Sequence, residues 1–134
     1  MFRAVNQASV DYRRLVDLNS VEMRAGGFPY LNSERCVQAW ANIYRETEAT
    51  LEWMGDRRRR EIYDLWKHTN ELRDREMLKN IVLSSARNGG VCGVFLVGAA
   101  HRKSIIDKVF VEGGTGVPQI DWDLAGFLKE EGGD

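Results

Sequence analysis

The sequence predicts an α/β fold that is rich in helix, with a small, mainly parallel sheet on which the helices pack. Apolar residues recur at helical spacing before residue 86 and again after residue 101. Between these segments lies a nearly continuous apolar run, VCGVFLVG, bounded by glycines. Such a short run is typical of a strand buried on both faces in a parallel sheet. We therefore expect residues 91–97 to form the central strand.

Size and composition limit the classes of protein. A chain of 134 residues suits one domain, and 43% hydrophobic with 29% charged residues indicates a globular chain. A net charge of -1 argues against nucleic-acid binding, which favours a basic surface. No apolar run reaches the roughly 18 residues that a membrane span needs. The first 15 residues hold no hydrophobic signal core, so we expect the protein in the cytoplasm.

The first half of the chain reads as helices separated by one loop. Residues 1–20 predict a short amphipathic helix, and residues 23–34 predict a loop because they contain two glycines and a proline. Asn32 or Ser33 can cap the next helix. That helix has the clearest apolar periodicity in the chain and ends at Gly55. The apolar members expected to face inward on the first helix are Val10, Leu15, Val16 and Leu18.

Two helices are expected before the apolar run and one directly after it. Residues 56–68 form the first, with Asp56 as its cap and Ile62, Leu65 and Trp66 on one side. Residues 70–86 form the second, and residues 101–109 form the helix that follows the run, with Ile105, Ile106 and Val109 inward. A short strand near residues 108–112 and a last helix over residues 121–131 complete the expected order.

A single buried strand leaves its backbone N–H and C=O groups without partners. Further strands therefore lie near residues 1–30 and 108–112, or another chain supplies them. We expect one domain over residues 1–134, or a half-domain that oligomerisation completes.

His101 is the first candidate functional residue. A strand that ends at Gly98 can turn sharply, because glycine tolerates a positive φ. His101 then lies at the first turn of the next helix, where the helix dipole disfavours imidazolium and keeps the ring neutral. Ligands bind beyond the carboxyl ends of parallel strands, which is where this places His101. The alternative is a histidine whose ring only caps or packs.

Asp74 and Arg73 are the second candidate. Helical spacing puts Asp74 on an apolar stripe, where a carboxylate must be paired or face a cavity. Arg73 lies one step round the helix, near Asn80. An inward Arg and Asp pair can hold an anion or orient a ligand. The alternative is a helix that starts near residue 71, where Asp74 simply favours the positive end of the dipole and Arg73 extends to solvent.

Other noticeable residues have simpler interpretations. The four arginines at 57–60 precede acidic residues and predict a solvated helix face. His68 lies near an expected helix end, and we expect it to be a polar surface residue. Cys36 and Cys92 lack the spacing of metal ligands. We expect both to be buried thiols in a reducing compartment. Core or interface anchors are expected at Trp40, Trp53, Trp66 and Trp122.

Two motifs together resemble the second half of the EreA/ChaN-like superfamily, which includes the TraB, PrgY and TIKI proteins. Arg73, Asp74 and Met77 fit its Arg-Asp-x-x-Met helix. Gly98 and His101 fit the Gly-x-x-His motif that follows a strand in that family. The matched part is about a quarter of the chain. The resemblance implies an α/β fold and a site that includes His101 and Arg73.

The chain also departs from this family. Many members have a glutamate where this chain has Leu72, and members carry two Gly-x-x-His halves where this chain has one. Nothing before residue 70 resembles the first half, so the acidic and histidine groups expected from it are missing.

Two functions follow from these residues. The first is a non-catalytic interaction domain, a remnant of the EreA/ChaN-like fold that self-associates or binds a protein partner, with no nucleic acid and no membrane. The alternative is a metal-dependent hydrolase. In it His101 is a metal ligand or general base, Arg73 binds an anionic group, and the metal is a divalent ion. The ligand-binding residues expected around them are Gly98, Asp74 and Asn80. A lone imidazole holds such a metal poorly, because catalytic sites usually have about three protein ligands.

Overall fold

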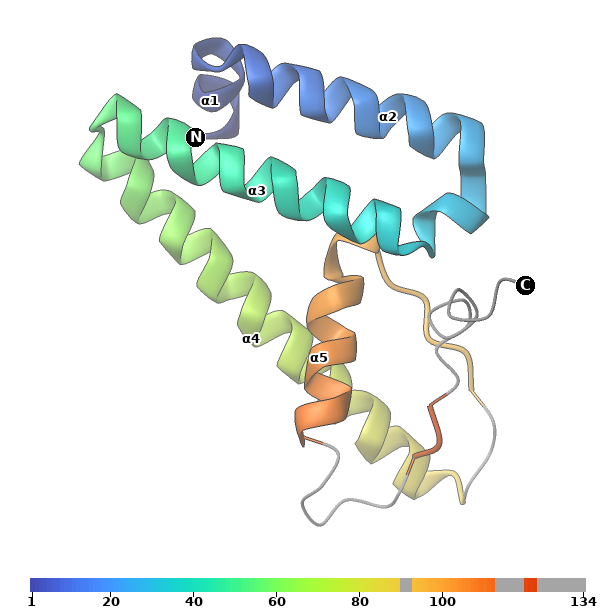
Figure 1. Cartoon of the computed structure of the whole chain (residues 1–134). Coiled ribbons are helices and arrows are strands. Elements are labelled where there is room, and N and C mark those ends of the chain that lie inside the picture. Colours follow the sequence, from blue (N-terminus) through green and yellow to red (C-terminus); the bar gives the residue numbers. More distant parts are fainter. Residues whose placement is uncertain (90–92, 113–119, 123–134) are drawn as a thin grey trace. The chain divides into compact units, whose positions relative to one another are not determined.

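The structure, a computed structural model, describes residues 1–89, 93–112 and 120–122, with the side chains of α5 described up to residue 109. Helices make up most of this part of the chain (Figure 1). In order they are α1 (Phe2–Ala8), α2 (Val10–Leu31), α3 (Glu34–Met54), α4 (Arg57–Arg87), the 3-10 turn η1 (Ala99–His101) and α5 (Arg102–Glu112). The chain divides into two compact units, one formed by residues 1–67 and one that begins at residue 68, and each is described separately.

The predicted α/β fold with a parallel sheet is wrong, because the described residues contain helices and no strand. Residues 93–98 are an irregular connection, and residues 91 and 92 lie outside the described part. The expected partner segments are helical, since residues 108–112 belong to α5 and most of residues 1–30 to α1 and α2. A strand needs a neighbouring strand for its backbone hydrogen bonds, and no described segment offers one.

The side chains of the irregular connection also differ from a strand buried on both faces. Val94 is 87% exposed and Leu96 is 81% exposed, whereas Phe95 and Val97 are half-buried. The apolar run therefore does not serve as the core of this unit in the way that its composition predicts. The expected last helix over residues 121–131 lies almost entirely outside the described residues, and residues 121 and 122 have no regular structure.

The two helices expected over residues 56–68 and 70–86 are one continuous helix, α4. The predicted break fails because Thr69 and Asn70 are weak helix formers but do not break a helix as proline does. Ile62 and Leu65, expected on the same side of the helix as Trp66, are 45% and 65% exposed. The helix does end after Arg87, before the expected glycines.

The loop expected over residues 23–34 is mostly the last part of α2. Gly27 has φ 51° and ψ -138°, which are not helical angles, so two helical segments of α2 meet at a kink at this residue. Tyr30 lies beyond this bend, is buried, and donates a hydrogen bond from its hydroxyl to Asn19 Oδ1 at 2.8 Å. Glycine supplies the unusual backbone angle, and the buried hydrogen bond holds the bent end against the body of α2.

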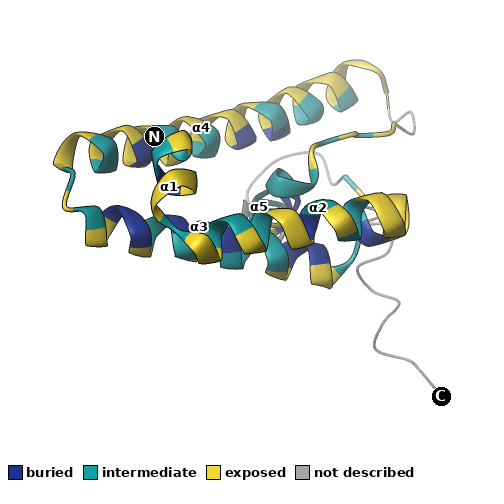
Figure 2. Ribbon diagram, turned by 90° about the horizontal axis from the view of Figure 1, so that it is seen from above, coloured by how far each residue is buried: buried dark blue, intermediate teal, exposed yellow. Residues whose placement is uncertain are grey.

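The predicted start and end of α3 are confirmed. Ser33 caps it by accepting a hydrogen bond from the Cys36 N–H at 3.2 Å. Gly55 ends it in the left-handed conformation with φ 61°. Asp56 then accepts a hydrogen bond from the Arg59 N–H at 3.0 Å, as expected for the cap of the next helix. Figure 2 shows buried positions recurring along α3, as its apolar periodicity predicts.

The core of the first unit gathers side chains from α1, α3 and α4. Val5, Leu51 and Tyr63 are buried together, each no more than 1% exposed. Phe2 meets Trp66 edge to face at 5.1 Å between ring centroids, and Tyr63 stacks on Trp66 at 5.7 Å. Phe2 and Trp66 thus pack against the buried core through their rings.

Several single-residue expectations can also be compared with the structure. Val10 and Leu18, expected to be inward, are exposed, whereas Leu15 and Val16 are half-buried. Trp53 is 79% exposed and is therefore no core residue. Trp40, Trp66 and Trp122 are half-buried.

The remaining expectations concern exposed or buried polar groups. Among the arginines at 57–60, Arg57 and Arg58 are exposed, whereas Arg59 and Arg60 are half-buried. Three of the four pair with acidic residues of the same segment. His68 is exposed. Cys36 is buried as a thiol, and Cys92 lies outside the described residues.

Within the described residues, no helix combines the length and the apolar character that a membrane crossing requires.

Candidate functional site

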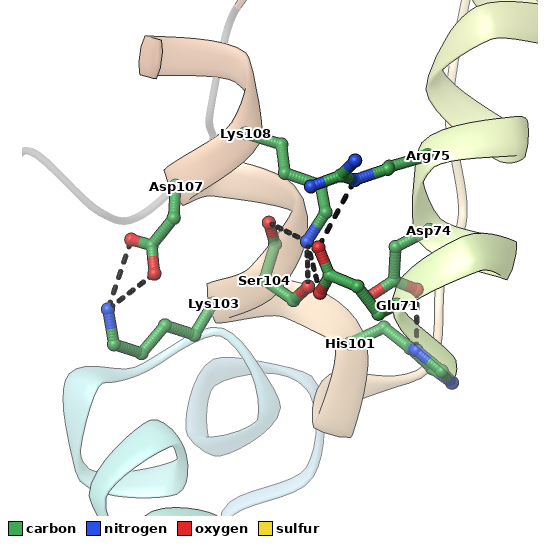
Figure 3. Close-up of polar contacts among 8 residues, drawn as sticks. All are labelled: Glu71, Asp74, Arg75, His101, Lys103, Ser104, Asp107 and Lys108. Atoms are coloured by element: carbon green, nitrogen blue, oxygen red, sulfur yellow. Dashed lines mark hydrogen bonds and ion pairs between the residues drawn. The ribbon is translucent and has the colours of Figure 1, made fainter. Parts of the chain in front are cut away.

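His101 and Asp74 meet in the second unit (Figure 3). His101 Nδ1 lies 2.8 Å from Asp74 Oδ1. Asp74 comes from α4, and His101 is the last residue of η1, directly before α5. The Asp74 side chain is 3% exposed and the His101 side chain is 25% exposed. A buried carboxylate therefore holds one nitrogen of a ring that is partly open to solvent.

This hydrogen bond selects the tautomer of His101. An ionised carboxylate can only accept, so Nδ1 must carry the proton that the bond contains. In the neutral ring, Nε2 then keeps a lone pair. Among the described residues Nε2 has no hydrogen-bond partner. The arrangement can accept a proton from a water or hydroxyl group at Nε2, while the carboxylate stabilises the imidazolium that forms.

The tight turn before α5 delivers His101 to this position. Gly98 caps η1, and its carbonyl accepts a hydrogen bond from the His101 N–H at 2.9 Å. Gly98 has φ -61° and ψ 139°, so the prediction that it uses a positive φ is wrong. A Cβ atom at this position would have His101 Cδ2 at 3.8 Å as its neighbour, which is ordinary contact. The prediction that His101 lies at the opening of the next helix is confirmed.

Asp74 lies in the middle of α4 on the buried side, together with the buried Leu78 and the half-buried Met77. The apolar stripe predicted from spacing is therefore confirmed at these positions. The alternative that Asp74 sits near a helix N-terminus is wrong, because α4 begins at Arg57. A carboxylate on such a stripe needs a partner, and His101 supplies it.

A second polar contact joins the same two helices (Figure 3). Lys108 of α5 donates from Nζ to Glu71 Oε2 at 2.9 Å and to Ser104 Oγ at 2.7 Å. The Lys108 side chain is 10% exposed. The hydrogen bond from Lys108 lowers the pKa of the Glu71 carboxyl below its ordinary value, against a smaller rise from burial. The sequence offered the Ser104 and Lys108 spacing of one helical turn as a signal, but nothing that joins Lys108 to Glu71.

The other predicted site residues do not join this pair within the described residues. Arg73 and Asn80 lie on α4 at exposed positions, and no described contact brings either to His101. Gly98 contributes through its backbone alone. The inward pair expected from Arg73 and Asp74 is thus replaced by Asp74 and His101.

The residues at this site do not fit a metal centre. Within the described part of the chain, no group of three or more histidine, cysteine, aspartate or glutamate side chains is placed to hold a metal ion. Nδ1 of His101 and Oδ1 of Asp74 face each other at hydrogen-bond distance, so these two atoms do not converge on a third point.

The fold and the site together define a helical protein with a partly exposed histidine held by a buried aspartate. No family model, curated protein or solved structure matches this chain. The resemblance to the EreA/ChaN-like superfamily therefore stays a prediction that depends on its two motifs.

Proposed function

We propose that this chain is a hydrolase in which His101 acts as general base and Asp74 orients it. The single observation that supports the proposal is the 2.8 Å contact between His101 Nδ1 and the buried Asp74 carboxylate. A His and Asp pair of this geometry is one arrangement that supports general-base catalysis, with one nitrogen fixed and the other available.

The chemistry follows from the two nitrogens of the ring. Nε2 takes a proton from a water molecule as that water attacks an ester or a related acyl group. The imidazolium forms beside the Asp74 carboxylate, and it then returns the proton to the leaving group. Proton transfer by a positioned side chain contributes roughly 100- to 10,000-fold to a rate. This role uses residues that the chain itself supplies, whereas anion binding by Arg73 stays a prediction without a described contact.

Hydrolysis of p-nitrophenyl acetate by the purified protein tests this proposal. We expect the protein to accelerate the reaction, and we expect His101→Ala and Asp74→Asn to lose most of that acceleration. His68→Ala is the matched control, since His68 is the other histidine of the chain and is exposed. Equal rates for the wild type and His101→Ala would contradict the general-base role.

A second candidate function is self-association through the irregular connection before η1. Val94 and Leu96 are the most exposed large apolar side chains in the described residues, at 87% and 81%. Contiguous exposed apolar surface is typical of an interaction site, and a second copy of the chain is the partner that the sequence favours.

The molar mass in solution, measured by light scattering, tests whether the chain self-associates. We expect Val94→Ser with Leu96→Ser to lower the mass of any oligomer to that of the monomer. Val10→Ser with Leu18→Ser on α2 is the control, because these residues are also exposed, at 68% and 57%. A monomeric wild type would contradict self-association.

The cytoplasm is the compartment that we propose. Cys36 is buried as a thiol, which fits a reducing environment.

A further inference from the structure

The contact between Lys108 and Glu71 runs parallel to the contact between His101 and Asp74. Glu71 precedes Asp74 by one turn of α4, and Lys108 follows His101 by about two turns along η1 and α5. Both contacts join α4 to the continuous segment of η1 and α5 (Figure 3). They therefore form two links between α4 and the segment that carries His101.

Every N–H donor of the Lys108 ammonium has a hydrogen-bond acceptor nearby. Its three possible donors have three acceptors, namely Glu71 Oε2 at 2.9 Å, Ser104 Oγ at 2.7 Å and the Ser104 carbonyl at 3.5 Å. The other carboxylate oxygen of Glu71 accepts from Arg75 Nε at 3.2 Å. A closed set of partners of this kind leaves no donor of Lys108 for a ligand, so the cluster holds the helices and does not bind substrate.

We propose that Lys108 and Glu71 are positioning residues for His101. One hydrogen bond between two helices allows one helix to pivot about it, whereas two links spaced along the helices fix rotation and register. The Lys108 link thus keeps α5 at the angle at which His101 Nδ1 faces Asp74. The inference rests on the proposed function of His101, which it extends to two residues that have no described hydrogen bond with Asp74 or His101.

The nitrogen resonances of the His101 ring test this inference. A long-range 15N spectrum of the imidazole separates a protonated Nδ1 from an unprotonated Nε2. When the wild-type ring is neutral, we expect one protonated Nδ1 and one unprotonated Nε2. In Lys108→Met the separation between the two resonances should narrow toward an averaged value, because the ring then exchanges between tautomers. Lys108→Arg keeps a cation at this place and should restore the wild-type pattern.

Lys103→Met is the matched control on the same helix. Lys103 pairs with Asp107 within α5, at 2.8 Å and on an exposed face, so its loss should leave the His101 resonances unchanged. Glu71→Ala removes the acceptor of the same link, and it is the second variant if Lys108→Met does not fold.

Two results are distinguishable. A wild-type pattern of resonances in folded Lys108→Met or Glu71→Ala would overturn the positioning role and leave the role of His101 intact. Averaged tautomers already in the wild type would overturn both.

Discussion

The carboxylate of Asp74 needs a hydrogen-bond partner, because its side chain is 3% exposed and lies on an apolar stripe. A buried ion without a partner costs several kcal/mol. The imidazole of His101 offsets this cost through one hydrogen bond. Stability and the proposed chemistry therefore depend on the same two atoms.

Replacement of Asp74 by asparagine tests this link. The amide keeps the shape but can donate to Nδ1, which favours the tautomer with a proton on Nε2. We expect a loss of about 1–3 kcal/mol in the free energy of unfolding, because a hydrogen bond to a charged group is replaced by a weaker one between neutral groups. Urea unfolding measures it. Asp107→Asn is the control, since Asp107 pairs with Lys103 at an exposed site and should cost less than about 1 kcal/mol. Equal losses for the two variants would contradict the account.

Glu71 predicts a pH dependence of a definite sign. Its pKa in the folded protein is lowered from the ordinary 4.5, chiefly by the hydrogen bond from Lys108. A lowered folded pKa adds stability above the ordinary pKa, and that stability is lost as the pH falls through the folded value. We expect wild type to be more stable than Glu71→Gln at pH 7, with the difference shrinking below about pH 4.5. A difference in unfolding free energy that stays constant down to pH 2 would contradict this.

At the scale of elements, we expect alanine substitutions at two glycines, one after α3 and one before η1, to change the melting temperature by different amounts. Gly55 ends α3 with φ 61°, which costs about 1–2 kcal/mol for a residue with a Cβ atom. Gly98 has φ -61° and room for a Cβ atom. We therefore expect Gly55→Ala to lower the melting temperature and Gly98→Ala to leave it nearly unchanged. The reverse order would show that Gly98 needs its conformational freedom after all.

The start of α2 depends on a side chain with two roles. Ser9 Oγ accepts from the Tyr12 N–H at 2.9 Å and donates to Glu46 on α3 at 2.7 Å. Ser9→Ala removes a cap and a link between helices, so we expect a loss of about 1–2 kcal/mol in unfolding free energy. Ser20→Ala on the same helix is the control and should stay within about 0.5 kcal/mol. A loss for Ser9→Ala no larger than that of the control would contradict this role.

At the scale of the whole molecule, local signals could be read from the sequence and long-range pairing could not. Ser33, Gly55 and Asp56 mark helix ends through contacts with near neighbours, so their roles are visible in the sequence. The apolar run before Gly98 carries no such signal, because periodicity alone does not tell a strand from an irregular segment. The class of fold was wrong for that reason.

The candidate site shows the same division. Apolar spacing identified Asp74 as a carboxylate that needs a partner, and the turn after Gly98 identified His101. The partners stand 27 residues apart, and no local pattern joins them. The family resemblance places Arg73 beside His101, whereas the structure pairs His101 with Asp74. Which residue of α4 meets His101 depends on how α4 packs against η1 and α5, and the sequence pattern does not contain that information.

Because the described segments are helical, we expect their optical spectra to show the features of α-helix and not those of β-sheet. Far-ultraviolet circular dichroism should show the double minimum of α-helix, and the infrared amide I band should lack a strong β component. A dominant β band would contradict the helical fold.

The pairing of His101 with Asp74 is tested most directly by a double-mutant cycle. The free energies of unfolding are measured for wild type, Asp74→Ala, His101→Ala and the double variant. We expect a coupling energy of about 1–3 kcal/mol between the two side chains. A coupling energy below about 0.3 kcal/mol, within the additivity of independent sites, would show that the two side chains do not interact and would contradict the proposed site.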